Sequence, residues 1–267
     1  MYTYLVFTLT YTFWSSISFI TDIYGSDDMI QNKIGTKDRS KLLQLYKKIL
    51  PRVVFNVYIA TLPLIYFDLY IDYNIGMQFN LFNSLIHIFL SVVMSEILFY
   101  TFHRISHHKF LYKRFHKIHH ELKEPIGMGA VYTHWLDAIL GVYIPDGIPI
   151  FLLYAHPYTV HFWIFLTTSV SILMAHSNYK DLSEYHDDHH RLSCVNFGNG
   201  FFMDKIFRTE KTSNRNRRKT FIKAKNKFAS EVKSLRGELN KVYKDKYQYE
   251  VASNLVRTLK NTLTKKP

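Results

Sequence analysis

The chain has 267 residues, 16% of them aromatic, and a formal net charge of +13. This length is sufficient for one sizeable domain or a small membrane bundle, and its one cysteine, Cys194, excludes an intramolecular disulfide. Basic residues concentrate in the C-terminal quarter, from Lys205 onward. Because this basic tail follows several apolar segments and contains no recognisable nucleic-acid-binding motif, attraction to anionic lipid explains it better than nucleic acid does.

Apolar and polar segments alternate along the first half of the chain. Residues 1–20 carry no charge and are long enough to form a first membrane span. Residues 27–52 are polar and basic with leucines and isoleucines at helical spacing, which predicts an interfacial helix or loop on the cytosolic side. Residues 53–70 and 79–102 are a second and a third apolar segment.

Two further apolar stretches follow, at residues 138–155 and 157–175. Pro145 and Pro149 interrupt the first of them, so a re-entrant hairpin or a kinked helix fits it as well as a straight span. Two spans or one hairpin both return the chain to the side of the membrane from which it left.

Histidines dominate the region between these apolar segments. Eight of the 14 histidines fall in three boxes with spacings of three or four residues: His103 and His107; His116, His119 and His120; His186, His189 and His190. Residues at these spacings share one face of a helix, so each box is predicted to aim its imidazoles in one direction. A zinc site uses three or four ligands, and eight imidazoles therefore suit two metal ions. His134 and His176 lie close enough in sequence to be further candidates.

The predicted fold is all-α: a polytopic membrane helix bundle with about four spans or hairpins and a cytosolic histidine-rich di-metal cap. We expect three regions, with membrane spans and a linker at 1–94, the catalytic region at 95–209 and a basic cytosolic tail at 210–267. The positive charge of the tail predicts the cytosolic orientation.

Imidazole ligands suit iron, zinc, copper or nickel, and ligand type alone does not choose among them. Carboxylates are expected to orient the rings through hydrogen bonds; the candidates are Glu96, Asp137, Glu184, Asp187 and Asp188. A pair of redox metals beside a lipid-filled space suggests oxygen activation and attack on a C–H bond, which acid–base groups cannot break. The sequence has no His-Glu-x-x-His motif and no dinucleotide fingerprint, so electrons must come from a separate protein.

The boxes resemble the HxxxH, HxxHH and HxxHH pattern of the fatty acid hydroxylase/sterol desaturase superfamily, over residues 95–209. Further segments resemble the sterol branch, which includes sterol C4-methyl oxidases and cholesterol 25-hydroxylase. These segments are Pro125-Ile126-Gly127, Tyr132 to Asp137, His176-Ser177-Asn178-Tyr179, Asn196-Phe197-Gly198 and Asp204. The sequence departs from the family pattern at Asn178, which stands for a glycine, and at Asp137, which stands for a glutamate; the loop from Tyr179 to His186 is also short.

The resemblance implies a membrane enzyme of the endoplasmic reticulum that holds two iron ions on the eight box histidines, with His134 and His176 as additional ligands. It implies O2 as oxidant and electrons from NAD(P)H through cytochrome b5 or a reductase. The implied reaction is hydroxylation or oxidation of C–H bonds in a sterol or related lipid.

Two alternatives stay open. Within the same superfamily, the chain would be a fatty-acyl or sphingolipid hydroxylase, or a desaturase, since the same oxidant can remove two hydrogens. From another class, it would be a non-catalytic zinc-binding membrane protein, whose metal site would be closed and redox-silent.

Overall fold

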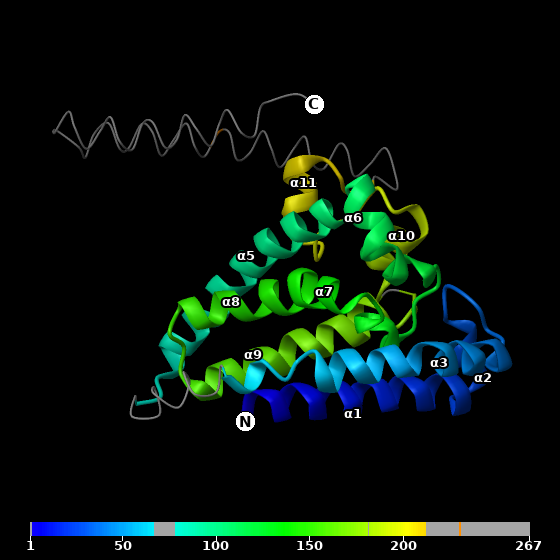
Figure 1. The fold of residues 1–267 in the computed structure, drawn as a ribbon, viewed down its shortest axis with the longest axis horizontal. Coiled ribbons are helices and arrows are strands. Elements are labelled where there is room, and N and C mark those ends of the chain that lie inside the picture. Colours follow the sequence, from blue (N-terminus) through cyan, green and yellow to red (C-terminus); the bar gives the residue numbers. More distant parts are fainter. Residues whose placement is uncertain (1, 67–77, 181, 212–229, 231–267) are drawn as a thin grey trace. The chain divides into compact units, whose positions relative to one another are not determined.

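The computed structural model describes residues 2–66, 78–180, 182–211 and 230. Every regular element within these ranges is helical (Figure 1), which confirms the predicted all-α class. The α-helices are α1 (Tyr2–Tyr24), α2 (Asp27–Gln31), α3 (Arg39–Val54), α5 (Leu81–Ser106), α6 (Lys109–Arg114), α7 (Trp135–Ala138), α8 (Ile144–Leu152), α9 (Pro157–Val170), α10 (Glu184–Leu192) and α11 (Met203–Phe207).

Short π-helical and 3-10 turns extend or connect these helices. They are η1 (Phe55–Ile59), η2 (His116–Glu121), η3 (Gly127–Val131), η4 (Ile139–Tyr143) and η5 (Ser171–Ala175). All of these elements belong to one compact unit that ends at Glu210. The predicted tail at 210–267 lies almost entirely outside the described residues, and the division into three regions stays a prediction.

Four helices of the described chain are long and apolar enough to cross a membrane, in agreement with the expected number. They are Arg39–Tyr66, Leu81–Ser106, Trp135–Leu152 and Pro157–Ala175. Helix α1, which we predicted as the first span, is not among them. Its serine, threonine and tyrosine side chains lower its mean hydropathy, and several of the serines and threonines are buried.

The first candidate span unites two segments that the sequence analysis separated. Asp38 caps α3 by accepting hydrogen bonds from the backbone N–H groups of Ser40 and Lys41, and the helix then continues through η1 to Tyr66. Its buried side chains recur at helical spacing, and Lys41, Lys47, Lys48 and Arg52 are exposed. Residues 67–70 of the predicted apolar segment lie outside the described residues. In Figure 1, α1 and α3 run side by side along the bottom of the unit.

The stretch with two prolines forms a helix. Pro145 lies in the first turn of α8, directly after the π-helical turn η4, and Pro149 lies further inside the helix. The segment Trp135–Leu152 is therefore helical throughout, with the π-helical turn η4 in its middle. The sequence left a hairpin, a kinked helix or a straight span open for this stretch. The structure has one helix there, and a second helix, α9, follows it.

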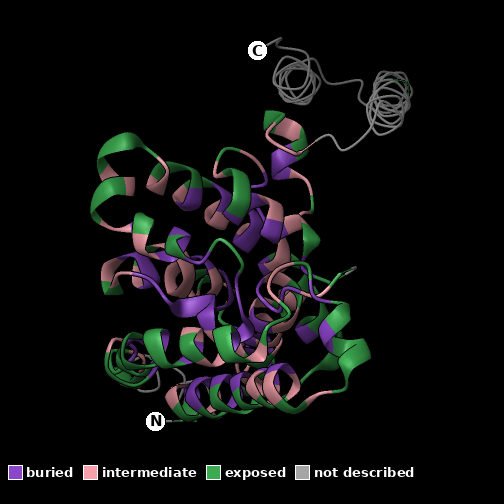
Figure 2. Ribbon diagram, turned by 90° about the vertical axis from the view of Figure 1, so that its right-hand side faces the viewer, coloured by how far each residue is buried: buried purple, intermediate pink, exposed green. Residues whose placement is uncertain are grey.

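A hydrophobic core joins α1 and α3 to the turns η3 and η5. Ile49, Ile126 and Ile172 are at most 1% exposed, and buried residues gather on the inward sides of the helices (Figure 2). Gly127 permits this packing, because a Cβ atom there would lie 2.5 Å from Ser18 Oγ. The core thus holds η3, which follows the second histidine box, against η5, which precedes His176.

Candidate metal centre

The three boxes lie on different kinds of local structure. His103 is buried in the last turns of α5 and His107 caps its C-terminal end. The third box lies on α10, as expected. The second box forms the 3-10 turn η2 and not an α-helix. A 3-10 turn has about three residues per turn, so its side chains point in directions that α-helical spacing does not predict.

Nine histidines form two groups, and within each group the ligand nitrogens lie within 4.8 Å of one another. The five-histidine group consists of His103, His107, His116, His120 and His189. The four-histidine group consists of His119, His176, His186 and His190. The structure thus brings all eight box histidines together, but boxes two and three each contribute to both groups. The expectation that each box points in one direction holds for the first box alone.

Hydrogen bonds determine which nitrogen of three rings in the five-histidine group carries the proton. Nδ1 of His103 lies 2.6 Å from the Phe197 carbonyl oxygen, and Nδ1 of His189 lies 2.7 Å from that of Val195. Nδ1 of His116 lies 2.8 Å from Asp137 Oδ2. A carbonyl or carboxylate oxygen only accepts, so each Nδ1 donates and each Nε2 of a neutral ring presents a lone pair.

These Nε2 atoms face one another. His103 Nε2 lies 3.2 Å from His116 Nε2, and His120 Nε2 lies 3.1 Å from those of both His107 and His189. No proton is available between the His103 and His116 nitrogens when both rings are neutral. A cation would satisfy both, and two nitrogens bound to one ion at about 2.1 Å would have a separation of this size. The residues therefore fit a metal ion.

The four-histidine group likewise contains rings whose Nδ1 donates to a backbone carbonyl, and ring nitrogens that a metal ion could bind. Nδ1 of His119 donates to the Tyr132 carbonyl at 3.3 Å, and Nδ1 of His176 donates to the Ser171 carbonyl at 2.8 Å. No described residue provides a hydrogen bond to His186 Nε2 or to either nitrogen of His190, although these atoms are buried. Buried polar atoms without partners are costly, and a metal ion would supply the missing partner.

Five of the rings outside the membrane-spanning helices are held in the neutral form that metal binding requires. Burial lowers the pKa of His107 to about 3 and that of His176 to about 4. Burial, with the neighbouring imidazoles as a second cause, also holds the pKa of the rings of box three well below the ordinary value.

Comparison with known proteins agrees with this geometry. The fatty acid hydroxylase family model matches residues 88–209, which contain all nine of these histidines. This region is a fatty acid hydroxylase domain. The expected superfamily is thereby confirmed.

Several curated relatives share the domain. A fatty acid hydroxylase of Mycosarcoma maydis is 28% identical over 72% of this chain and 53% of its own length. Methylsterol monooxygenase 1-2 of Arabidopsis thaliana is 34% identical over 42% of each chain. Methylsterol monooxygenase 1 of Gallus gallus is 30% identical over 65% of this chain and 64% of its own. The chain spans between about a third and about half of the length of the first relatives it matches. No solved structure matches it significantly.

The two further candidate ligands, His134 and His176, have different surroundings. His176 is buried within the four-histidine group. His134 lies outside both groups: its Nδ1 accepts a hydrogen bond from the backbone N–H of Leu136 and caps α7. Its ring packs against Phe115 and Trp135. A ligand role for either histidine stays a prediction.

Of the five candidate carboxylates, Asp137 alone is hydrogen-bonded to a ring among the described contacts. Glu184 is exposed and Asp188 pairs with Arg191 at the surface. Glu96 accepts from the backbone N–H groups of Asn199, Phe202 and Met203. It thereby holds the loop whose Phe197 carbonyl orients His103.

Backbone carbonyls orient four of the nine rings, and the sequence analysis missed them. They belong to Tyr132, Ser171, Val195 and Phe197. Every residue has a carbonyl, so no letter of the sequence marks these positions. Val195 and Phe197 flank Asn196, whose φ is 55°.

Asn178, which stands where the family pattern has glycine, has a φ of 62°. Asparagine tolerates this left-handed region better than most residues. Its side chain also accepts from Gly35 N at 2.7 Å and donates to Asp187 Oδ1 at 3.1 Å. Nearby, the fully buried Lys33 Nζ lies 2.7 Å from Asp22 Oδ1 and donates to the Ser177 carbonyl. The N-terminal segment is therefore bonded to the loop that carries His176.

Proposed function

We propose that this chain is a membrane-bound di-iron oxygenase, an oxidoreductase that oxidises C–H bonds of a sterol or related lipid. The oxidant is O2, and the electrons are supplied by a separate protein. The observation that carries the proposal is the pair of histidine groups, in which buried, neutral rings direct lone pairs towards two centres. Relatives named as hydroxylases and monooxygenases support the same reaction type.

Iron held by the two groups would supply the activation of O2 that oxidation of an unactivated C–H bond requires. The chain's own residues would hold the metal ions and orient the rings that bind them. Asp137 and the carbonyls of Phe197, Val195, Tyr132 and Ser171 fix the rings, and such partners raise ligand basicity. Eight of the nine histidines are buried, which limits the access of water to their rings.

We place the enzyme in the endoplasmic reticulum membrane, with the histidine groups and the C-terminus on the cytosolic side. The basic C-terminal region supports this orientation, since positively charged segments favour the cytosolic side. NAD(P)H would then supply electrons from the cytosol through cytochrome b5 or a reductase.

A sterol or related lipid is the favoured substrate because methylsterol monooxygenases recur among the relatives and the sterol-branch segments lie at the site. Tyr132 and His176, from two of these segments, both take part in it. A fatty-acyl substrate is the alternative, and a fatty acid hydroxylase among the relatives supports it.

The decisive experiment compares His107→Ala with His108→Ala. His107 belongs to the five-histidine group, whereas its neighbour His108 is exposed and belongs to neither. We expect about two iron ions per wild-type and His108→Ala chain, and a lipid shifted by one oxygen, by a lost methyl or by two hydrogens in their membranes. His107→Ala should lack the product and hold less iron.

Redox-silent zinc in place of iron, with lipid profiles that do not differ between wild type and His107→Ala, would contradict the proposal. That outcome would favour the zinc-binding alternative. Equal product from both variants would contradict the assignment of His107 to the metal.

A further inference from the structure

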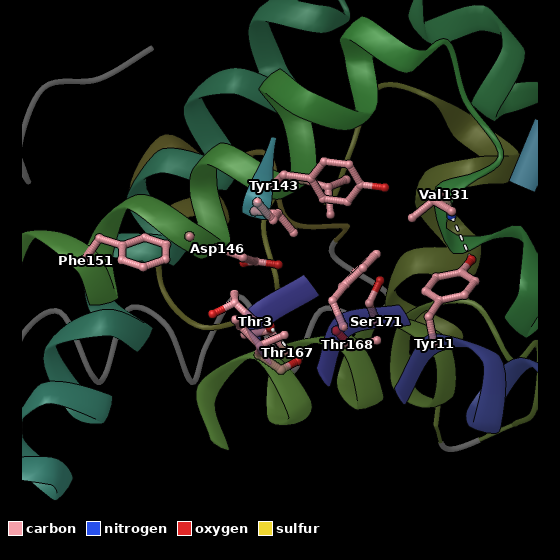
Figure 3. Close-up of a pocket in the computed structure, with 14 residues that line it drawn as sticks. Thr3, Tyr11, Val131, Tyr143, Asp146, Phe151, Thr167, Thr168 and Ser171 are labelled. Carbon is pink, nitrogen blue, oxygen red and sulfur yellow. Dashed lines mark hydrogen bonds between the residues drawn. The ribbon is translucent and has the colours of Figure 1, made fainter. Parts of the chain in front are cut away.

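A partly open cavity lies between α1, the η4–α8 segment and the α9–η5 segment (Figure 3). Phe7, Val142, Phe151 and Ile164 line it, so most of its surface is apolar. An apolar lining of this kind suits the hydrocarbon part of a lipid.

One end of the cavity lies next to the four-histidine group. Val131 and Ser171 line this end together with Tyr11 (Figure 3). The Ser171 carbonyl accepts from His176, and the carbonyl of Tyr132, the residue after Val131, accepts from His119. The backbone that positions two of the four rings therefore also forms the wall of the cavity.

The opposite end holds a carboxyl group that the metal centre does not use. Asp146 lines the cavity near Phe151 (Figure 3). Ser95 is the only described side chain that donates to this carboxyl, to Oδ1 at 2.7 Å, and no described cation pairs with it. An ionisable residue inside a membrane-spanning helix is expensive, and such residues commonly mark substrate pathways.

The two tyrosine hydroxyls of the cavity already donate to groups within the protein. The Tyr11 hydroxyl donates to the Met128 carbonyl, and the Tyr143 hydroxyl donates to the Asn56 carbonyl. Among the described contacts, the second oxygen of the Asp146 carboxyl accepts no hydrogen bond. It can therefore accept one from a ligand that carries a donor on an otherwise apolar body.

We propose that the cavity binds the substrate lipid through one hydroxyl, which donates to the Asp146 carboxyl, with the lipid's other end at Val131 and Ser171. This inference rests on the proposed function, because it treats the bound lipid as the substrate. Asp146 and Asp137 lie on one helix, about 13 Å apart at about 1.5 Å per residue. Asp137 contacts His116, so the oxidised carbon is remote from the hydroxyl.

The test measures binding of tritiated cholesterol to the purified full chain in detergent, with competition by unlabelled cholesterol or by its 3-methyl ether, which lacks the donor. Loss of one hydrogen bond to a charged group lowers binding affinity by about 10-fold or more. Wild type should prefer cholesterol by this factor, and Asp146→Leu should bind both alike. Asp146→Asn, which keeps an acceptor oxygen, should retain part of the preference.

A second pair of variants tests the cavity without removing the carboxyl. Gly147 lines the cavity, and a Cβ atom there would meet only Phe151, at 3.7 Å. Gly147→Ala should therefore bind cholesterol as wild type does, whereas Gly147→Phe should fill the space and bind at least about 10-fold more weakly. Metal content equal to that of wild type in every variant shows that the fold is intact.

Absence of cholesterol binding in wild type, equal affinity of wild type for cholesterol and its ether, or binding unaffected by Asp146→Leu would overturn the inference. An oxygen added next to the hydroxyl would overturn the orientation. If the wild-type chain holds iron and oxidises lipid but Asp146 has no effect, this inference fails while the proposed function stands. If cholesterol binding depends on Asp146 but the chain holds no iron, the binding inference stands while the proposed function fails.

Discussion

Asp137 holds one histidine ring in place, so neutralising its carboxyl should weaken one metal site and spare the other. Its Oδ2 accepts from His116 Nδ1 at 2.8 Å and from the Thr133 hydroxyl, and its side chain is only 7% exposed. His116 belongs to the five-histidine group. The change Asp137→Asn therefore acts on this group alone.

The expected loss of metal affinity follows from the role of the hydrogen bond between Asp137 and His116. Loss of a partner that orients a metal-bound histidine costs about 10–100-fold in affinity, which corresponds to about 1.4–2.8 kcal/mol. Asp137→Asn should fall at the lower end of this range because an amide oxygen still accepts from Nδ1. Asp137→Ala should reach the upper end because it leaves His116 and Thr133 without an acceptor.

The assay is a titration of metal-depleted protein with Co2+ in competition with a chelator, followed by absorbance. We expect two binding steps in wild type and a shift of one step in each variant. Asp188→Asn is the matched control, since it removes a carboxylate that pairs with Arg191 at the surface. A shift of both steps, or of neither, would refute the reasoning.

Three further predictions concern the described N-terminal contacts and the tail. Asn178→Ala should lower the melting temperature more than Asn178→Gly, because glycine accepts the positive φ at no steric cost; an equal loss would argue against strain at this position. Lys33→Met should destabilise the fold by about 3–5 kcal/mol, since it leaves the Asp22 charge buried and unpaired. The double change Lys33→Met/Asp22→Leu should recover part of the loss in chemical denaturation, and no recovery would contradict the pairing. A chain truncated before Phe221 should keep its full metal content by elemental analysis; loss of metal would show that the tail is structural.

Much of the site could be predicted from spacing and composition. The histidine boxes stand out because metal chemistry needs several nitrogen donors close together, and separations of three or four residues bring donors onto one face of a helix. The four candidate spans follow from apolar composition, which is a local property of the chain. Both features concern residues that are near one another in sequence.

Other features depended on contacts between distant segments. The sequence analysis separated residues 27–52 from the apolar segment that follows, whereas the structure joins them in one helix against α1. Helix α1 was predicted as a span, but its hydroxyl groups serve contacts inside the protein: Ser18 Oγ, for example, is hydrogen-bonded to Tyr46.

The sequence by itself determined the ligand chemistry and the helical class, and the tertiary structure decided how the ligands are divided. The partition into five and four histidines arises because η2 is a 3-10 turn and because the η3–η5 contact brings His176 to His119. His134, by contrast, is turned to cap α7. Spacing sets which side chains share a helix face, but long-range packing sets which faces meet, and a pattern of neighbouring residues carries no information about that.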